Sequence, residues 1–208
     1  MALAVLLVAD QAARIAELSR ALRGHGLRLS GVAGDGGRAV DLCRALAPDL
    51  VLVDLGPGDD GLAAARLINR KAPRAVVLIS QRADQAFIAR AREAGAQACL
   101  PLPLGDGVLG PALELAHRGF VRERDLAQEV GELRENLRRR KLVERAKGVL
   151  MQRLGLNHAE AEARLNAQAA EQGLAPHQAA AALVAAADAP RHAGRRRVRP
   201  ADPQANPA

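Results

Sequence analysis

The sequence is poor in aromatic residues, with two Phe and neither Tyr nor Trp among 208 residues. Proteins that hold single-stranded nucleic acid by base stacking need exposed aromatic side chains, as in RRM sheets and stacking channels. This chain lacks the residues for such a platform. Any contact with nucleic acid must therefore depend on charge and shape.

Cysteine is equally scarce, because Cys43 and Cys99 are the whole complement. Neither belongs to a C-x-x-C pair or has a histidine at metal-ligand spacing, so we expect buried, reduced thiols rather than a disulfide or a zinc site. No apolar run approaches the ~18 residues of a membrane-spanning helix, and no basic leader precedes the first apolar run. These absences predict a soluble, cytoplasmic protein that does not associate with membranes.

Positive charge is in excess, with 30 Lys and Arg against 23 Asp and Glu and a net charge of +7. The excess is concentrated, since residues 121–153 carry 10 basic and 6 acidic side chains and residues 190–208 carry 5 and 1. Basic segments attract phosphate-bearing partners. One internal segment and the tail are therefore the candidates for contact with nucleic acid.

Residues 1–120 alternate short apolar runs with amphipathic stretches of helix length, the pattern of parallel strands joined by crossover helices. The expected strands are 3–8, 27–32, 50–54, 75–80 and 98–100, with helices at 11–24, 37–46, 62–71, 84–94 and from 108 onward. We predict an α/β domain of flavodoxin-like type, with a doubly wound, parallel, five-stranded sheet. Chemistry in such sheets collects at the carboxyl ends of the strands, which places Asp10, Asp54 and Ser80 at the candidate site.

This half of the chain resembles the receiver domain of bacterial response regulators, through LLVAD ending at Asp10, PDLVLVDL around Asp54 and LIS ending at Ser80. The resemblance implies a phosphoacceptor at Asp54, a Mg²⁺ site that includes Asp10, and a phosphoryl contact from Ser80. Two positions depart from the family pattern. Ala9 replaces the second acidic residue, and Leu102 stands where the family has a lysine.

Two interpretations of this site stay open. In the first, Asp10 and Asp54 hold Mg²⁺ weakly, since this ion takes one or two carboxylates plus phosphate oxygens, and Asp54 accepts a phosphoryl group. In the second, loss of the lysine charge that stabilises a transferring phosphoryl group leaves a pseudo-receiver that signals through protein contacts. No cofactor other than this Mg²⁺ is expected.

Residues 121–140 are expected to form a dimerisation helix. Leu126, Val130, Leu133 and Leu137 recur at 4-3-4 spacing, which is the seam of a coiled coil. About two heptads are visible before Arg140 ends the seam. The pattern predicts a parallel homodimer, and the alternative is a helix that packs on its own domain.

The next segment, RRRKLVERAKGVLMQRLG at 138–155, has a two-sided pattern. At about 100° per residue, one face collects the residues expected to be buried, which are Leu142, Val143, Ala146, Val149, Leu150 and Leu154. The other face collects Arg140, Lys141, Arg145 and Lys147, with Gly148 among them. Four cations around a residue without a side chain suit a folded nucleic-acid backbone, and the alternative is a solvated basic face.

Two short helices follow, at about 157–171 and 176–187. The run ERAKGVLM at 144–151, together with these helices, resembles the ANTAR domain of transcription antiterminators. Residues 141–189 are therefore expected to form an ANTAR RNA-binding domain, and residues 190–208 a disordered basic tail. Leu165-Asn166 and Ala169-Ala170 depart from the family pattern in the second helix.

With the receiver-like half included, the chain resembles the nitrate-assimilation regulators of the NasT type. That resemblance implies a homodimer that binds hairpins in leader mRNA and affects RNA polymerase only indirectly, by blocking a terminator. It also implies a ligand-sensing protein partner, NasS-like, that holds the regulator until nitrate or nitrite arrives. In this scheme Arg140, Lys141, Arg145 and Lys147 anchor the RNA backbone, and Gly148 permits its close approach.

An enzyme built on Asp10, Asp54 and Ser80 is the remaining alternative. The five histidines lie in expected helices, turns or the tail, away from the strand ends, and no nucleophile–base pair is evident. We therefore expect a transcription regulator rather than a flavodoxin-like enzyme.

Overall fold

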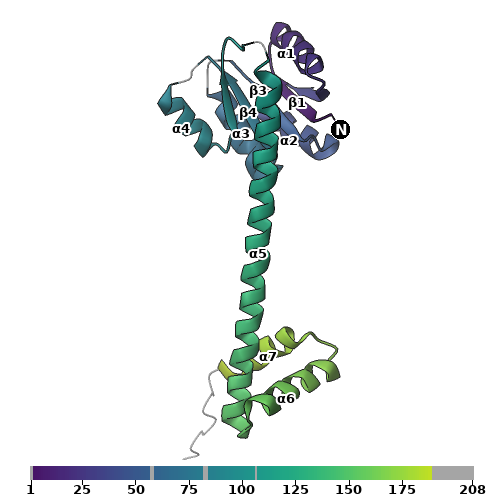
Figure 1. Ribbon diagram of the computed structural model, residues 1–208, viewed down its shortest axis with the longest axis vertical. Helices are drawn as coiled ribbons and strands as arrows, with labels where there is room; N and C mark the ends of the chain where they lie inside the picture. Colours follow the sequence, from purple (N-terminus) through teal and green to yellow (C-terminus); the bar gives the residue numbers. More distant parts are fainter. Residues whose placement is uncertain (1, 57–58, 82–83, 106, 189–208) are drawn as a thin grey trace, which may run out of the picture. The chain divides into compact units, whose positions relative to one another are not determined.

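The computed structural model describes residues 2–56, 59–81, 84–105 and 107–188 (Figure 1). The chain divides into two compact units between Glu129 and Val130. The expected domain limits at 120 and 140 both fall within one continuous helix, α5, which runs from Leu109 to Leu154. The basic tail at 190–208 lies outside the described residues.

The first unit is built on a parallel sheet, which over the described residues has five strands in the order β2-β1-β3-β4-β5. Its strands are β1 (Ala4–Ala9), β2 (Arg28–Ala33), β3 (Leu50–Asp54), β4 (Ala75–Ser80) and β5 (Ala98–Pro101). The helices between them are α1 (Ala12–Gly24), α2 (Gly36–Leu46), α3 (Asp60–Lys71) and α4 (Gln85–Glu93). The predicted fold class is confirmed, and each strand limit lies within one residue of the prediction.

Helices cover both faces of this sheet, which is why its central strands are continuously apolar. One buried cluster joins the sheet to α2, α3 and α4 and includes Val51 and Ile68. The other joins it to α1 and the start of α5 and includes Leu52 and Leu113. β1 and β3 pair in parallel with Ala9 opposite Asp54, so the chain leaves both strands at the same edge of the sheet.

Capping side chains set the beginnings of two of these helices. The Asp35 carboxylate accepts a hydrogen bond from the Arg38 backbone at the start of α2, and Asp84 accepts one from Phe87 at the start of α4. After α4, Gly95 has a φ of 81°, and a Cβ there would lie 2.4 Å from the Asn69 side chain. Only glycine fits this turn, which leads the chain back into β5.

The second unit consists of the C-terminal part of α5 with α6 (His158–Glu171) and α7 (Pro176–Asp188), packed side by side (Figure 1). Five of its eight buried core residues are alanine: the set is Ala146, Leu150, Ala161, Leu165, Ala169, Ala179, Ala180 and Val184. Small side chains allow the helices to approach closely, but each buries little apolar area. The few larger residues therefore provide most of the packing in this unit.

The turn between α5 and α6 forms as the sequence predicts. Gly155 ends α5 with a φ of 69°, and Asn157 and Glu160 form a reciprocal capping box at the start of α6. Leu154 was expected on the buried face, and this expectation was wrong, because its side chain is 57% exposed. Helix α5 ends at this residue, and the last α5 side chain in the buried apolar cluster is Leu150, one turn earlier.

The two cysteines are free thiols, with Cys43 buried and Cys99 partly buried. Burial raises the pKa of both thiols, which keeps them protonated and unreactive. Within the described ranges, no helix combines the length and apolarity that crossing a membrane requires.

Candidate functional site

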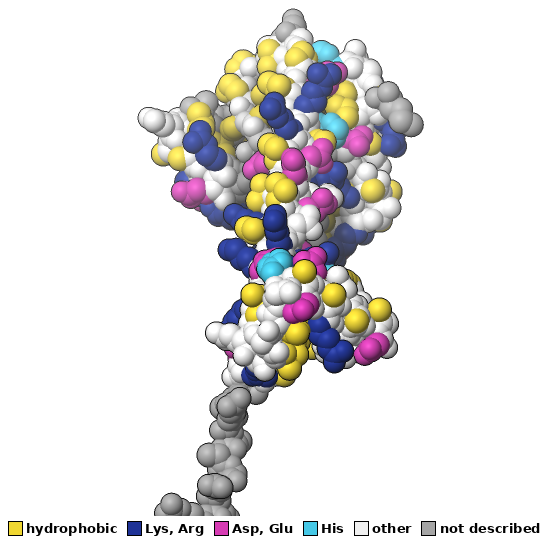
Figure 2. Space-filling view, turned by 60° about the horizontal axis from the view of Figure 1, so that its bottom comes forward, with side chains coloured by type: hydrophobic (Ala, Val, Ile, Leu, Met, Phe, Trp, Pro, Cys, Tyr) yellow, Lys and Arg dark blue, Asp and Glu magenta, His cyan; other side chains and the backbone are white. Residues whose placement is uncertain are grey.

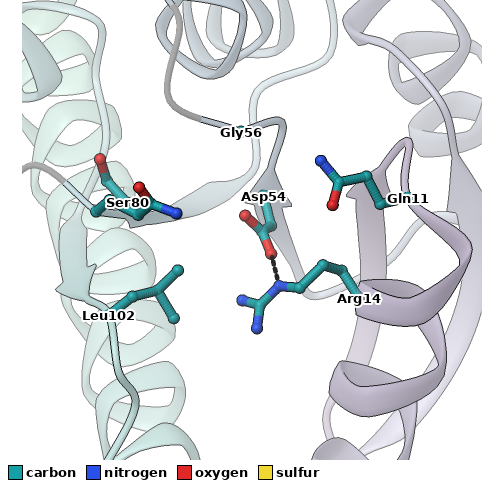
Figure 3. A pocket seen from close by; sticks show the side chains of 7 residues that line it. Gln11, Arg14, Asp54, Gly56, Ser80 and Leu102 are labelled. Atoms are coloured by element: carbon teal, nitrogen blue, oxygen red, sulfur yellow. Dashed lines mark hydrogen bonds and ion pairs between the residues drawn. The ribbon is translucent and has the colours of Figure 1, made fainter.

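The structure brings part of the predicted receiver site together around a cavity of about 170 Å³ at the carboxyl edge of the sheet (Figure 3). Asp54 ends β3, Ser80 ends β4, and both side chains are buried. Leu102, just after β5, lines the same cavity. Asp10 follows β1 but is exposed and is not part of the described lining, so the structure does not bring it together with Asp54 and Ser80.

An arginine that was not predicted from the sequence reaches this cavity from the first turn of α1. Arg14 donates a hydrogen bond from Nε to Oδ2 of Asp54 at 2.8 Å (Figure 3), and its Nη1 lies 2.8 Å from Glu17. Its Nη2 is buried, with no hydrogen-bond partner among the described residues. Burial lowers the pKa of Arg14, but the hydrogen bond and charge of Asp54 outweigh this and the pKa is raised.

The position of Arg14 in the sequence indicates that it can reach this site. It lies four residues after Asp10, so the first turn of the helix carries it back toward the strand ends. Polar side chains in the first helical turn after a strand, and not only those at the strand end, can therefore belong to such a site.

The donors at this site do not fit the expected Mg²⁺. Magnesium requires near-octahedral oxygen ligands, yet Ala9 offers no side-chain donor, Asp10 is exposed, and Asp54 already binds the Arg14 guanidinium. Within the part of the chain that the structure describes, no group of three or more His, Cys, Asp or Glu side chains is arranged to hold a metal. The weak Mg²⁺ site at Asp10 and Asp54 stays a prediction, and these contacts argue against it.

Helix α5 presents three of the four predicted cations to solvent. Arg140, Lys141 and Arg145 are exposed. Gly148 is also exposed, and a Cβ added there would meet no other atom within 4 Å. The surface above Gly148 is therefore open, as the predicted close approach of a backbone requires.

Lys147, the fourth predicted cation, is in a different environment. Its side chain is buried, and its Nζ lies 2.7 Å from Glu144 and 3.3 Å from Glu162 of α6. The hydrogen bond from Lys147 lowers the pKa of Glu144, and the same bond raises the pKa of Lys147 against the effect of its burial. The expectation that Lys147 lies on the exposed basic face was wrong, because α6 places Glu162 against α5 and draws the lysine into the helix contact.

A polar groove of about 490 Å³ lies beside Gly148, between α5 and the end of α7. Arg145, Gln152 and Arg153 line it from α5, and Asp188 lines it from α7. Asp188 accepts hydrogen bonds from Arg145 Nη2 at both carboxylate oxygens, each at 2.9 Å. We call this feature the Gly148 groove. Gln152 and Arg153 were not singled out in the sequence, although residues 145, 148 and 152 share one helix face by their spacing.

Acidic and basic side chains are interspersed on the face of the molecule that Figure 2 draws, and do not form one continuous positive patch. Besides Asp188 and Glu162, the second unit exposes Glu160 and Glu171 on α6. Contact with a polyanion therefore depends on particular cations, and the net charge of the chain is a poor guide to it.

The four predicted seam residues are exposed in the single chain, from 44% for Val130 to 61% for Leu133. Their spacing along α5 places Leu126 and Leu133 at successive d positions and Val130 and Leu137 at a positions. Valine at a with leucine at d favours a parallel two-stranded coiled coil. Large apolar side chains in this arrangement fit burial by a partner helix.

Comparison with known proteins agrees with this architecture. The response regulator receiver domain family matches residues 5–114, and the ANTAR domain family matches residues 131–184. The transcriptional regulatory protein PdtaR of Mycobacterium tuberculosis is 40% identical over 158 residues, which cover 76% of this chain and 77% of that protein.

Solved structures resemble the receiver part of the chain. A LuxR-family two-component response regulator from Aurantimonas has a TM-score of 0.51 at 29% identity and covers 64% of this chain and 99% of its own. The receiver domain of a modulated diguanylate cyclase from Desulfovibrio desulfuricans has a TM-score of 0.52 at 26% identity and covers 59% and 99%. The receiver fold is joined here to an ANTAR domain, and the chain belongs to the ANTAR response regulators, which are RNA-binding antitermination regulators and not enzymes.

Proposed function

We propose that this chain acts as a homodimer that binds hairpins in the leader of a nascent mRNA and prevents a terminator from forming ahead of RNA polymerase. The proposal rests on one observation. Within the ANTAR segment, α5 exposes Arg140, Lys141 and Arg145 beside the open surface of Gly148.

These cations have different partners in the free protein, so we assign them different roles. Arg140 and Lys141 are exposed and adjacent, so they contact the RNA backbone directly. Arg145 is held by Asp188 in the free protein, and an arginine that already binds two carboxylate oxygens has the geometry to bind two phosphate oxygens instead. Lys147 is buried between two glutamates, and its role in the proposal is to hold α6 against α5.

Dimerisation through α5 gives one molecule two copies of the cationic surface beside Gly148. In a parallel pair, the d and a residues Leu126, Val130, Leu133 and Leu137 meet across the seam. Glu129 and Arg134 then occupy flanking g and e positions, where they carry opposite charges across the interface. Two sets of cations on one dimer match a leader with two hairpins.

We further propose that a ligand-sensing protein partner, NasS-like, controls the regulator, and that the target transcripts encode nitrate or nitrite assimilation. The resemblance of the chain to regulators of the NasT type supports this. Contact of Asp54 with Arg14, together with Ala9 and Leu102 at the family's acidic and lysine positions, favours a protein contact over phosphorylation as the signal. The second candidate is a regulator switched by phosphorylation at Asp54.

Filter binding of the full chain to a two-hairpin leader RNA from a neighbouring assimilation operon tests the proposal. Arg140→Ala and Lys141→Ala are each expected to weaken binding by about tenfold or less, because each removes one phosphate contact. Arg20→Ala, on α1 of the receiver unit, removes the same charge and is expected to leave binding unchanged. Equal binding by all four proteins would reject the assignment of Arg140 and Lys141.

The dimer is tested separately by sedimentation equilibrium. Leu133→Glu places a charge at the centre of the seam and is expected to give a monomer with weaker RNA binding. Gln128→Glu adds the same charge at position f, on the outer face of the helix, and is expected to remain dimeric. A wild-type chain that sediments as a monomer would reject this part of the proposal.

A further inference from the structure

The resemblance to receiver domains implies a Mg²⁺ ion beside the phosphoacceptor, and this chain places an arginine there instead. Asp54 is 7% exposed, and a buried carboxylate needs a compensating charge. Arg14 supplies that charge with a 2.8 Å hydrogen bond to Oδ2. Among the described residues that line the cavity, Arg14 is the only cation.

Arg14 is held in this position from two sides. Glu17, one turn further along α1, accepts a hydrogen bond from Nη1 at 2.8 Å, and Asp54 accepts the one from Nε. Across the cavity, Leu102 is apolar and offers no competing charge to Asp54 (Figure 3). The guanidinium is thus oriented by two carboxylates and lines the same cavity as Asp54.

We propose that Arg14 is a built-in counter-ion of Asp54 that excludes Mg²⁺ from the receiver site. The charge at Asp54 is then balanced by Arg14 whether or not Mg²⁺ is present in solution. Two effects act together. A divalent cation beside Asp54 is repelled by the positive charge of Arg14 at short range, and one carboxylate oxygen of Asp54, Oδ2, is already engaged by Arg14. The loss of one acidic ligand at Ala9 removes the attraction that would offset this repulsion.

Isothermal titration of the full chain with MgCl₂ tests the proposal without RNA, so its outcome is independent of the proposed RNA binding. Wild type is expected to show no saturable binding. Arg14→Gln removes the charge and retains a polar side chain. It is expected to bind Mg²⁺ with a Kd at least about tenfold below the lower limit that the titration sets for wild type. Arg14→Gln combined with Ala9→Asp restores the acidic pair and is expected to bind more tightly again.

Arg20→Gln provides the charge-matched control, because Arg20 is exposed on the same helix and is expected to behave as wild type. Folding of each variant is checked by far-UV circular dichroism and calorimetry, since the chain has no Trp or Tyr for fluorescence. Saturable Mg²⁺ binding to wild type that Asp54→Asn abolishes would overturn the proposal, and this outcome does not depend on whether the Arg14 variants fold. Arg14→Gln that folds and binds no more Mg²⁺ than wild type would overturn it as well.

Discussion

Each unit holds one cation between two carboxylates, Arg14 between Asp54 and Glu17 in the receiver unit and Lys147 between Glu144 and Glu162 in the second. In the receiver unit, this arrangement occupies the residue on which the family's phosphoryl chemistry depends. In the second unit, it lies in a helix contact and leaves Arg140 and Lys141 exposed.

The difference shows where this chain departs from its family and where it does not. The receiver unit keeps its fold and core but has a charge-neutralised site, whereas the second unit keeps exposed cations on a small, alanine-rich core. We therefore propose that a signal reaches the receiver unit through a surface contact, and that RNA binds through a few side chains of α5.

The largest difference between the units is expected in core substitutions. Leu165→Ala truncates one of the two buried leucines among the described residues of the second unit and is expected to cost about 2–5 kcal/mol of its unfolding free energy. Because that core is small, the helices of the second unit should unfold at low urea, as followed by circular dichroism.

Leu52→Ala provides the counterpart in the receiver unit, where Leu52 belongs to a larger cluster. It should lower the midpoint of urea unfolding and leave the unit folded in the absence of denaturant. If Leu165→Ala shifts no transition, the account of the second unit's packing is wrong.

Gly148→Ala separates the stability of the second unit from its contact with RNA. Replacing glycine by alanine within a helix is expected to raise the unfolding free energy by about 0.5–1 kcal/mol, since a Cβ there meets open space. RNA binding is expected to weaken by about tenfold, because the methyl group fills the closest approach to α5.

Gly131→Ala is the matched control, as Gly131 lies on the same helix and a Cβ there also meets no atom within 4 Å. It should give the same gain in stability with unchanged RNA binding. Equal RNA affinity for the two variants, measured by filter binding, would show that the Gly148 groove is not used.

Asp188→Asn removes the carboxylate that holds Arg145 in the free protein. Because the pair is exposed, its strength is about 0.2–1 kcal/mol, and freeing Arg145 is expected to tighten RNA binding up to about fivefold. Glu171→Gln, which removes one exposed negative charge from α6, should have a smaller effect. The proposed role of Arg145 is contradicted if Asp188→Asn binds RNA more weakly than wild type.

A smaller effect is expected in the pH dependence of the second unit's stability. The pKa of Glu144 is lowered from its ordinary value of 4.5 by the hydrogen bond from Lys147. Ionised Glu144 therefore adds to the unfolding free energy above about pH 4.5, and this stabilisation is lost as pH falls through the folded pKa. The pKa of Lys147 is raised from 10.5 by the hydrogen bond to Glu144. Charged Lys147 therefore adds to the unfolding free energy below about pH 10.5, and this stabilisation is lost as pH rises through the folded pKa.

Thermal unfolding by circular dichroism, repeated across pH, checks this prediction. Lys147→Met is expected to lower the Tm between these limits and to flatten the curve at both ends. A variant whose Tm follows the wild-type curve at every pH would exclude a stabilising role for Lys147.

The sequence carries more information about the fold than about the site. Continuous apolar runs such as Val51-Leu52-Val53 identify central strands, and local chemistry at Asn157 and Glu160 identifies the start of α6, because both depend on neighbours in sequence. Lys147 was misplaced because a helical wheel does not include α6, which supplies Glu162. Arg14 was missed because its partner, Asp54, is brought close only by the pairing of β1 with β3.

Salt dependence of RNA binding distinguishes the exposed cations of α5, which we propose bind the RNA, from the buried Lys147, which we propose holds the helices together. The slope of log Kd against log salt concentration is measured for folded wild type, Lys141→Met and Lys147→Met on one leader RNA. We predict that Lys141→Met reduces the slope by about 0.7 to 0.9, one phosphate contact, and that Lys147→Met leaves it unchanged. An unchanged slope for Lys141→Met with a reduced slope for Lys147→Met would contradict the account.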